Sequence, residues 1–235
     1  MSQPVLFLII HGVQAGKLSD SYAADFIDAI QEKITDSSNI FFRSINWGKL
    51  VEARQKDLYE KLISNHRFWL RPILKLMATI LADVLWYLLT QMGKDRSALE
   101  AEIDAMVRAE ISIFRQTHPN GLIIIGGHSL GSQIGLKLCY DSFKIHGLIT
   151  WGTFCLYLSG AYPDGGFPPP IKWWVNFFNP ADPVATQMIE NENFKDFVTV
   201  IPVHNYWRLT PIRAHQMYWH SDKVISAIAK KLQNP

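Results

Sequence analysis

The 235-residue chain has little cysteine and little charge of either sign. Its two cysteines, Cys139 and Cys155, are spaced as neither a disulfide framework nor a zinc site would require. Charged residues make up 19% of the chain, the net charge is +2, and like charges do not cluster. A nucleic-acid-binding surface needs a concentrated basic patch, so we expect no nucleic-acid partner. The hydrophobic share of 48% excludes a disordered chain.

The first residues also lack the features of a secretory signal. Residues 1–4 carry no basic side chain, and the apolar run that follows ends at His11. A signal peptide combines a basic start, a longer apolar stretch and a cleavage site of small residues. We therefore expect a cytoplasmic protein.

What the sequence does contain is an alternation of short apolar runs and longer amphipathic stretches. The apolar runs predict buried strands at 5–10, 40–47, 122–125, 147–151, 173–178 and 197–203. Helical periodicity is present at 19–35, 131–143 and 221–232. Alternating strands and helices imply right-handed crossovers, so the expected fold is α/β with a doubly wound, mostly parallel sheet. We expect residues 1–235 to form a single domain.

Residues 49–117 interrupt this alternation because they contain no strand pattern. We expect them to form a helical insertion that caps the domain. Within it, residues 68–92 are apolar and long enough to cross a bilayer. Arg71, Lys75 and Asp83 interrupt the stretch, and such charges are costly in lipid. We favour a buried or capping helix, and a peripheral membrane contact through 68–92 stays open as an alternative.

The stretch that indicates chemistry is 127–131, which reads Gly-His-Ser-Leu-Gly. It lies between a predicted buried strand and a predicted helix, the setting of a nucleophile elbow. Such a turn exposes the hydroxyl of Ser129 by holding its backbone in a strained conformation, while the glycines let neighbouring backbone pass closely. The start of the following helix directs N–H groups toward developing negative charge. Ser129 is therefore the candidate nucleophile.

In this pattern the chain resembles the α/β-hydrolase superfamily, and more narrowly its lipase, esterase and thioesterase members with Gly-His-Ser-Leu-Gly elbows. The resemblance covers residues 4–232, with 49–117 the least constrained part. It implies an α/β-hydrolase fold and a catalytic triad that follows the chain in the order serine, acid, histidine.

The acid that the resemblance implies is Asp182, in an Asp-Pro-Val sequence that follows the strand predicted at 173–178. A carboxylate there would accept the histidine Nδ1–H and fix its tautomer. An aspartate beside proline also commonly caps a turn, which is the structural alternative. Asp164, in a glycine-rich loop, is the competing acid.

The base that the resemblance favours is His215, in a segment that we expect to be a loop leading into the last helix. Similar members carry an aromatic pair three and four residues after the histidine, as Tyr218 and Trp219 do here. The alternatives that stay open are His220, His204 and, less favoured, His146.

The resemblance also implies an oxyanion hole built from two backbone N–H groups. One belongs to Leu130, after the nucleophile, and the other to Val13, after the first strand. Gly12 allows the close approach of that loop, and His11 is expected to hold the loop in place.

Together these residues predict a serine hydrolase that cleaves carboxylic ester or thioester bonds through an acyl-enzyme. The chemistry requires no metal and no organic cofactor. The apolar insertion favours a small-molecule substrate with an apolar acyl or aromatic group. Two alternatives stay open: a membrane-associated lipase or acyltransferase, and a non-catalytic binding module on the same fold.

Overall fold

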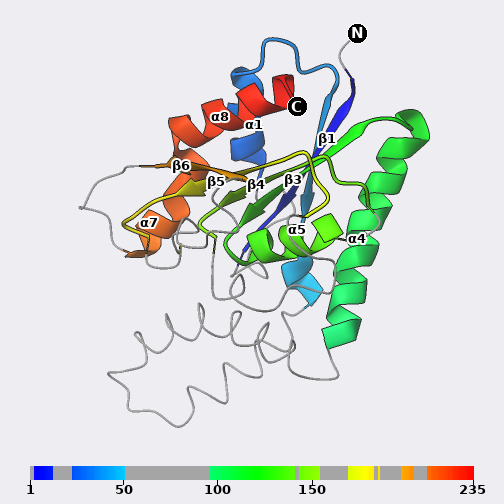
Figure 1. Ribbon diagram of the computed structural model, residues 1–235, viewed down its shortest axis with the longest axis horizontal. Helices are drawn as coiled ribbons and strands as arrows, with labels where there is room; N and C mark the ends of the chain where they lie inside the picture. Colours follow the sequence, from blue (N-terminus) through cyan, green and yellow to red (C-terminus); the bar gives the residue numbers. More distant parts are fainter. Residues whose placement is uncertain are drawn as a thin grey trace.

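The computed structural model describes residues 3–12, 23–50, 96–140, 143–153, 169–182, 185, 197–203 and 211–235. Its described residues form one six-stranded sheet in the order β2-β1-β3-β4-β5-β6 (Figure 1). All neighbouring strands are parallel. The strands are β1 (Val5–Ile10), β2 (Ile40–Ile45), β3 (Leu122–His128), β4 (Gly147–Trp151), β5 (Trp173–Phe178) and β6 (Val198–Pro202).

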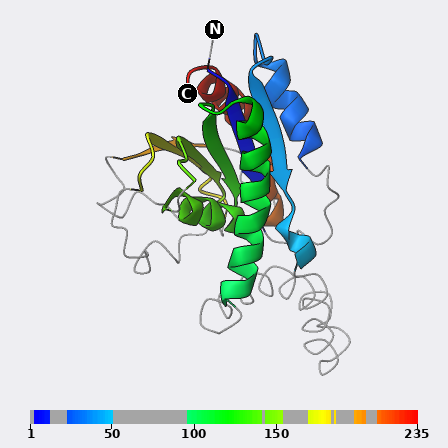
Figure 2. The same cartoon turned by 90° about the vertical axis from the view of Figure 1, so that its right-hand side faces the viewer.

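Helices of the described residues cover both faces of this sheet (Figure 2). They are α1 (Ala24–Glu32), α4 (Arg96–Thr117), α5 (Leu130–Tyr140), α7 (Pro211–Gln216) and α8 (Asp222–Gln233), with 3-10 helices η2 (Trp47–Leu50) and η6 (Met217–His220). Even-numbered residues of β1, such as Leu8, pack in one apolar cluster with α4 and α5. Odd-numbered residues, such as Phe7, pack in a second cluster with α1 and α8.

This double cover explains the sequence pattern of the strands. A strand buried on both faces is apolar at successive positions and does not alternate with polar residues. All six residues of β1 are buried, and so are all five of β4. The prediction of a doubly wound, mostly parallel α/β sheet is therefore confirmed.

Helix α4 lies in the segment 49–117, which the sequence predicts to be an inserted cap. Its apolar stripe packs against the sheet, because Ile103, Val107, Ile111 and Phe114 share a cluster with residues of β1 and β3. Residues 96–117 thus cover the sheet between β2 and β3. That 49–117 cap the domain stays a prediction, because residues 51–95, which include the apolar helix predicted at 68–92, lie outside the described residues.

The strand order places a topological switch point between β1 and β3. From β1 the chain moves outward to β2, and it then returns to the other side of β1 to form β3. Parallel sheets bind ligands at the carboxyl ends of the strands flanking such a point. Gly12 follows β1, and Ser129 follows β3. Among the helices that the structure describes, none combines the length and apolar character needed to cross a membrane.

Candidate active site

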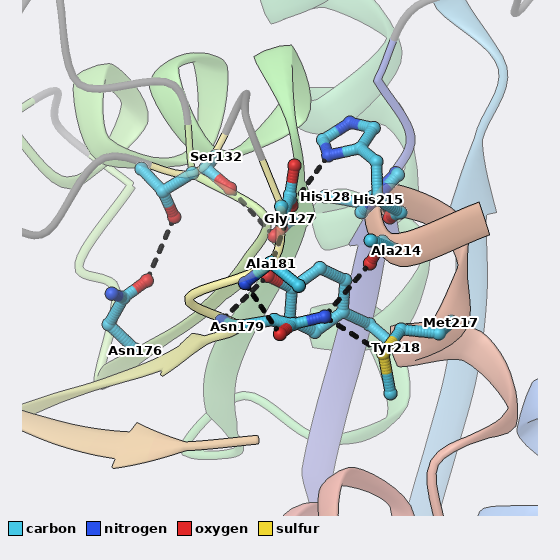
Figure 3. A network of polar contacts seen from close by, with 12 residues as sticks. Gly127, His128, Ser132, Asn176, Asn179, Ala181, Ala214, His215, Met217 and Tyr218 are labelled. Atoms are coloured by element: carbon cyan, nitrogen blue, oxygen red, sulfur yellow. Dashed lines mark hydrogen bonds and ion pairs between the residues drawn. The ribbon is translucent and has the colours of Figure 1, made fainter. Parts of the chain in front are cut away.

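Ser129 occupies the turn between β3 and α5 with a φ of 53°. This left-handed conformation is costly for a residue with a side chain, and such strain is found mostly at functional sites. Its backbone N–H donates to the carbonyl of Trp151 on β4 at 2.9 Å. The next turn of the chain is fixed by the Ser132 hydroxyl, which donates to the carbonyl of Gly127 at 2.8 Å (Figure 3).

Two glycines let other backbone segments reach Ser129. A Cβ at Gly131 would overlap the carbonyl oxygen of Ile10, so the first turn of α5 can lie directly on the end of β1. A Cβ at Gly12 would lie 2.5 Å from the Ser129 Cβ and 3.1 Å from its Oγ. The backbone after β1 therefore runs directly beside the serine hydroxyl, as an oxyanion loop requires.

His11 holds the backbone after β1 in place through several buried contacts. Its buried Nδ1–H donates to the Gly12 carbonyl at 2.7 Å, and its Nε2 contacts the side-chain amide of Asn46 at 3.1 Å. The Trp47 indole N–H donates to the carbonyl of His11 at 3.0 Å, and the two rings stack. Burial lowers the pKa of His11 to about 4, so the ring is neutral at physiological pH. Sequence reasoning missed Asn46 and Trp47 because they follow a different strand.

Asp182 and His215 meet at the carboxyl ends of the strands. His215 Nδ1–H donates to Asp182 Oδ2 at 2.8 Å, across 33 residues of sequence. Both residues are buried. Asp182 lies on the turn after β5, which is closed by hydrogen bonds from the Asp182 and Ala181 N–H groups to Asn179. With its proton on Nδ1, the His215 ring presents a lone pair at Nε2, and that buried atom has no hydrogen-bond partner among the described residues.

The predicted loop around His215 is wrong in its local structure. His215 lies in the short helix α7, and Tyr218 and Trp219 lie in the 3-10 helix η6 that follows it. Six residues are too few for helical periodicity to be recognised, although Pro211 at the first position is typical of a helix start. The histidine therefore lies in a helical turn, and η6, which follows directly, is joined to α8 by the single residue Ser221.

Tyr218 adds a second hydrogen bond to the same carboxylate oxygen. Its hydroxyl donates to Asp182 Oδ2 at 3.0 Å and accepts the N–H of Asn179 at 3.0 Å. Each direction is fixed, because a carboxylate only accepts and a backbone N–H only donates. Burial, and then the charge of Asp182, raise the pKa of Tyr218 above its ordinary value, so the hydroxyl keeps its proton. The sequence analysis used Tyr218 only as one of the aromatic pair after His215, and it did not predict a hydrogen bond from its hydroxyl to Asp182.

Asn179 joins the turn of Asp182 to helix α7, which carries His215. Its side-chain Nδ2 lies 3.4 Å from the carbonyl of Ala214 and 3.0 Å from the sulfur of Met217 (Figure 3). It is fully buried and precedes Pro180. Its position directly after a predicted strand and before a proline is the sequence signal that could have indicated Asn179.

The remaining predicted site residues are distributed as follows. Leu130 is buried at the start of α5, next to Ser129. His220 is exposed at the end of η6, and His146 precedes β4 at the opposite end of the sheet from Ser129. Val13, Asp164 and His204 lie outside the described residues. The described ranges also contain no cluster of three or more metal-ligating side chains.

Comparison with protein-family models and with curated proteins finds no match. Solved structures do match over nearly the whole chain. An α/β serine hydrolase without a lid from Xanthomonas campestris covers 100% of this chain and 81% of its own, with 12% identity and a TM-score of 0.52. A serine hydrolase homologue from Coxiella burnetii covers 99% and 88%, with 11% identity and a TM-score of 0.51. The chain has the α/β-hydrolase fold.

A dienelactone hydrolase from Anabaena variabilis is similar to the same degree. It covers 99% of this chain and 85% of its own, with 9% identity and a TM-score of 0.52. At such identities the likeness concerns the path of the backbone. The α/β-hydrolase fold predicted from the elbow and the strand pattern is therefore confirmed, while the roles of individual residues depend on their geometry in this chain.

Proposed function

We propose that the protein is a serine hydrolase that cleaves carboxylic ester or thioester bonds through Ser129, Asp182 and His215. The observation that carries the proposal is the buried His215–Asp182 pair, whose Nε2 has no hydrogen-bond partner among the described residues, together with the strained turn of Ser129. A histidine fixed at Nδ1 by a carboxylate and bare at Nε2 is the base that activates a serine hydroxyl.

The proposed reaction has two stages, acylation of Ser129 and hydrolysis of the acyl-enzyme. His215 Nε2 takes the Ser129 proton as Oγ attacks the acyl carbonyl, and Asp182 stabilises the imidazolium that forms. The oxyanion is bound by the N–H groups of Leu130 and Val13, with Gly12 allowing the approach. His215 returns the proton to the leaving alcohol or thiol. Water, deprotonated by the same nitrogen, then attacks the acyl-enzyme and releases the acid.

The substrate we propose is a small molecule with an apolar acyl or aromatic group. Residues 68–92 are rich in leucine, methionine and tryptophan, and they belong to the segment between β2 and α4. Burying such side chains stabilises a protein by about 1.5–3 kcal/mol each, so we expect them to line a covered, apolar site. The similar structures from X. campestris and C. burnetii are serine hydrolases by name, and the class proposed here agrees with theirs.

The test is a series of p-nitrophenyl esters from acetate to decanoate, with the matched thioesters, assayed on the wild type and on Ser129→Ala. We expect turnover that rises with acyl length and falls by about 10⁴-fold or more in the variant. The variant should fold normally, because it removes a single oxygen atom from a small buried side chain, and circular dichroism checks this. Retention of more than a few per cent of turnover by Ser129→Ala would contradict the mechanism.

A further inference from the structure

The residue before the nucleophile, His128, is the last residue of β3 and occupies the variable position of the elbow motif. Its side chain is buried and points into the segment that carries the candidate base. Its ring lies 4.7 Å from the ring of His215, measured between centroids, and 5.3 Å from that of Trp219. A solvated histidine beside the serine would make none of these contacts.

The decisive contact is a hydrogen bond between His128 and the main chain of His215. His128 Nε2 lies 3.0 Å from the carbonyl oxygen of His215, across 87 residues of sequence (Figure 3). A carbonyl only accepts, so the ring carries its proton at Nε2. Burial, and then the neighbouring His215, lower the pKa of His128 well below its ordinary value. The ring is therefore neutral, and its single N–H is committed to this contact.

Both ends of this bridge are fixed by other contacts. On one side, the Ser129 N–H binds the Trp151 carbonyl, which holds the turn that follows His128. On the other side, the His215 ring binds Asp182, so the peptide and the ring of His215 are held by different partners. His128 thus joins the peptide of the candidate base to the residue adjacent to the candidate nucleophile.

We propose that His128 is a positioning residue whose imidazole N–H sets the place of the His215 peptide relative to Ser129. The inference rests on the proposed function, because it assigns His128 to the alignment of the two reacting groups. A misplacement of about 1 Å between reacting groups can reduce turnover by about 100-fold. His128 acts on the reaction through His215, whose carbonyl it binds and whose ring it contacts.

Two substitutions separate the hydrogen bond from the packing. His128→Phe keeps a ring of similar size among Trp151, Tyr218 and Trp219 but has no donor. His128→Gln loses the ring but can place an amide N–H near the position of the imidazole Nε2. A purely structural histidine would be replaced better by phenylalanine than by glutamine, since the site is buried and aromatic.

The kinetic readout is kcat and KM on one p-nitrophenyl ester, with each protein normalised by active-site titration. We expect His128→Phe to lower kcat by about 10- to 100-fold with KM changed less than about threefold. His128→Gln should recover most of that loss. Full kcat in His128→Phe, or an equal loss in both variants, would overturn the inference.

Hydrogen–deuterium exchange decides the inference without reference to activity. Loss of the bridge should speed exchange of the peptide that covers residues 211–220 by about tenfold in His128→Phe but not in His128→Gln. Unchanged exchange in His128→Phe would overturn the inference. Absence of Ser129-dependent hydrolysis in the wild type would instead refute the proposed function, and the exchange experiment would then decide the role of His128 alone.

Discussion

One oxygen of Asp182 accepts two hydrogen bonds, from His215 and from Tyr218. The tyrosine is itself held by the N–H of Asn179, so its proton points to the carboxylate. A buried carboxylate that loses a donor is destabilised, because no water replaces the missing hydrogen bond. Tyr218 therefore supports both the stability of the fold and the orientation of the acid.

Tyr218→Phe tests this contact. It should lower the free energy of unfolding by about 1.5–3 kcal/mol, the range for a hydrogen bond to a charged group. It should also reduce kcat more than it changes KM, because Asp182 would be held by fewer donors. Urea unfolding and ester hydrolysis measure the two effects.

Tyr140→Phe is the matched control for this prediction. It removes the hydroxyl of the last residue of α5, whereas Ser129 directly precedes the first residue of that helix. The control should keep wild-type kcat. Equal kinetic effects of the two substitutions would contradict a specific role for the Tyr218 hydroxyl.

Local sequence signals recovered some residues of the candidate site and missed others. Ser129, Asp182 and His215 could be proposed because each follows a recognisable strand or lies in a motif that resembles those of α/β-hydrolases. His128, Asn179 and Tyr218 act through partners on other elements, and nothing in their immediate sequence names those partners. Sequence reasoning therefore proposed the candidate reacting groups but not the residues that contact them.

The two elements that frame the nucleophile, β1 and α5, touch through main-chain atoms at Gly131. A strand and a helix rarely approach so closely, because the Cβ atoms of the helix normally intervene. At Gly131 a Cβ would meet the backbone of Ile10 and His11, which cannot move without disturbing the sheet. The position of the Leu130 N–H thus depends on a glycine at 131.

Gly131→Ala should consequently displace the start of α5 and abolish most activity. We expect the free energy of unfolding to fall by at least about 1–3 kcal/mol, the usual cost of overpacking a core. Gly135→Ala, one turn later, is the matched control. Its Cβ would lie 2.9 Å from Cγ2 of Ile125 and 3.4 Å from Cδ1 of Leu148, so it would meet side chains and not main chain, and alanine is the better helix former.

The control should lose less stability than Gly131→Ala and keep near-wild-type turnover, measured by thermal unfolding and ester hydrolysis. If Gly131→Ala were as active as Gly135→Ala, the close contact would have no bearing on the candidate oxyanion site.

The helices and strands were predictable where both faces of a strand are buried, as in β1 and β4. The short helix α7 was not, because six residues show no periodicity and its position is set by contacts with the turn after β5.

Among the described residues, many buried polar side chains lie at the carboxyl edge of the sheet. His11 and His128 both lie there, buried and neutral, at the ends of two adjacent strands. Burial lowers the pKa of His11 to about 4 from an ordinary 6.5, and it lowers the pKa of His128 in the same direction. The unfolded chain therefore binds more protons than the folded protein once the pH falls below about 6.5.

The stability of the fold should decrease as the pH falls from about 6.5 to 4, because protonation then favours the unfolded chain. His11 alone accounts for about 3 kcal/mol over this window, as an order of magnitude. His11→Gln should flatten the dependence, whereas substitution of the exposed His220 by glutamine should leave it unchanged. Urea unfolding at pH 7, 5.5 and 4.5 measures the slope, and equal slopes for the three proteins would contradict this account.

Activation of Ser129 by His215 can be measured by covalent labelling. A fluorophosphonate probe forms an adduct with a serine hydroxyl only when a base removes its proton. Peptide mapping after a timed incubation should find the adduct on Ser129 in the wild type, and a rate at least about 10³-fold lower in His215→Ala. Labelling of the wild type at another residue, or labelling of Ser129 at the same rate in both proteins, would contradict the account.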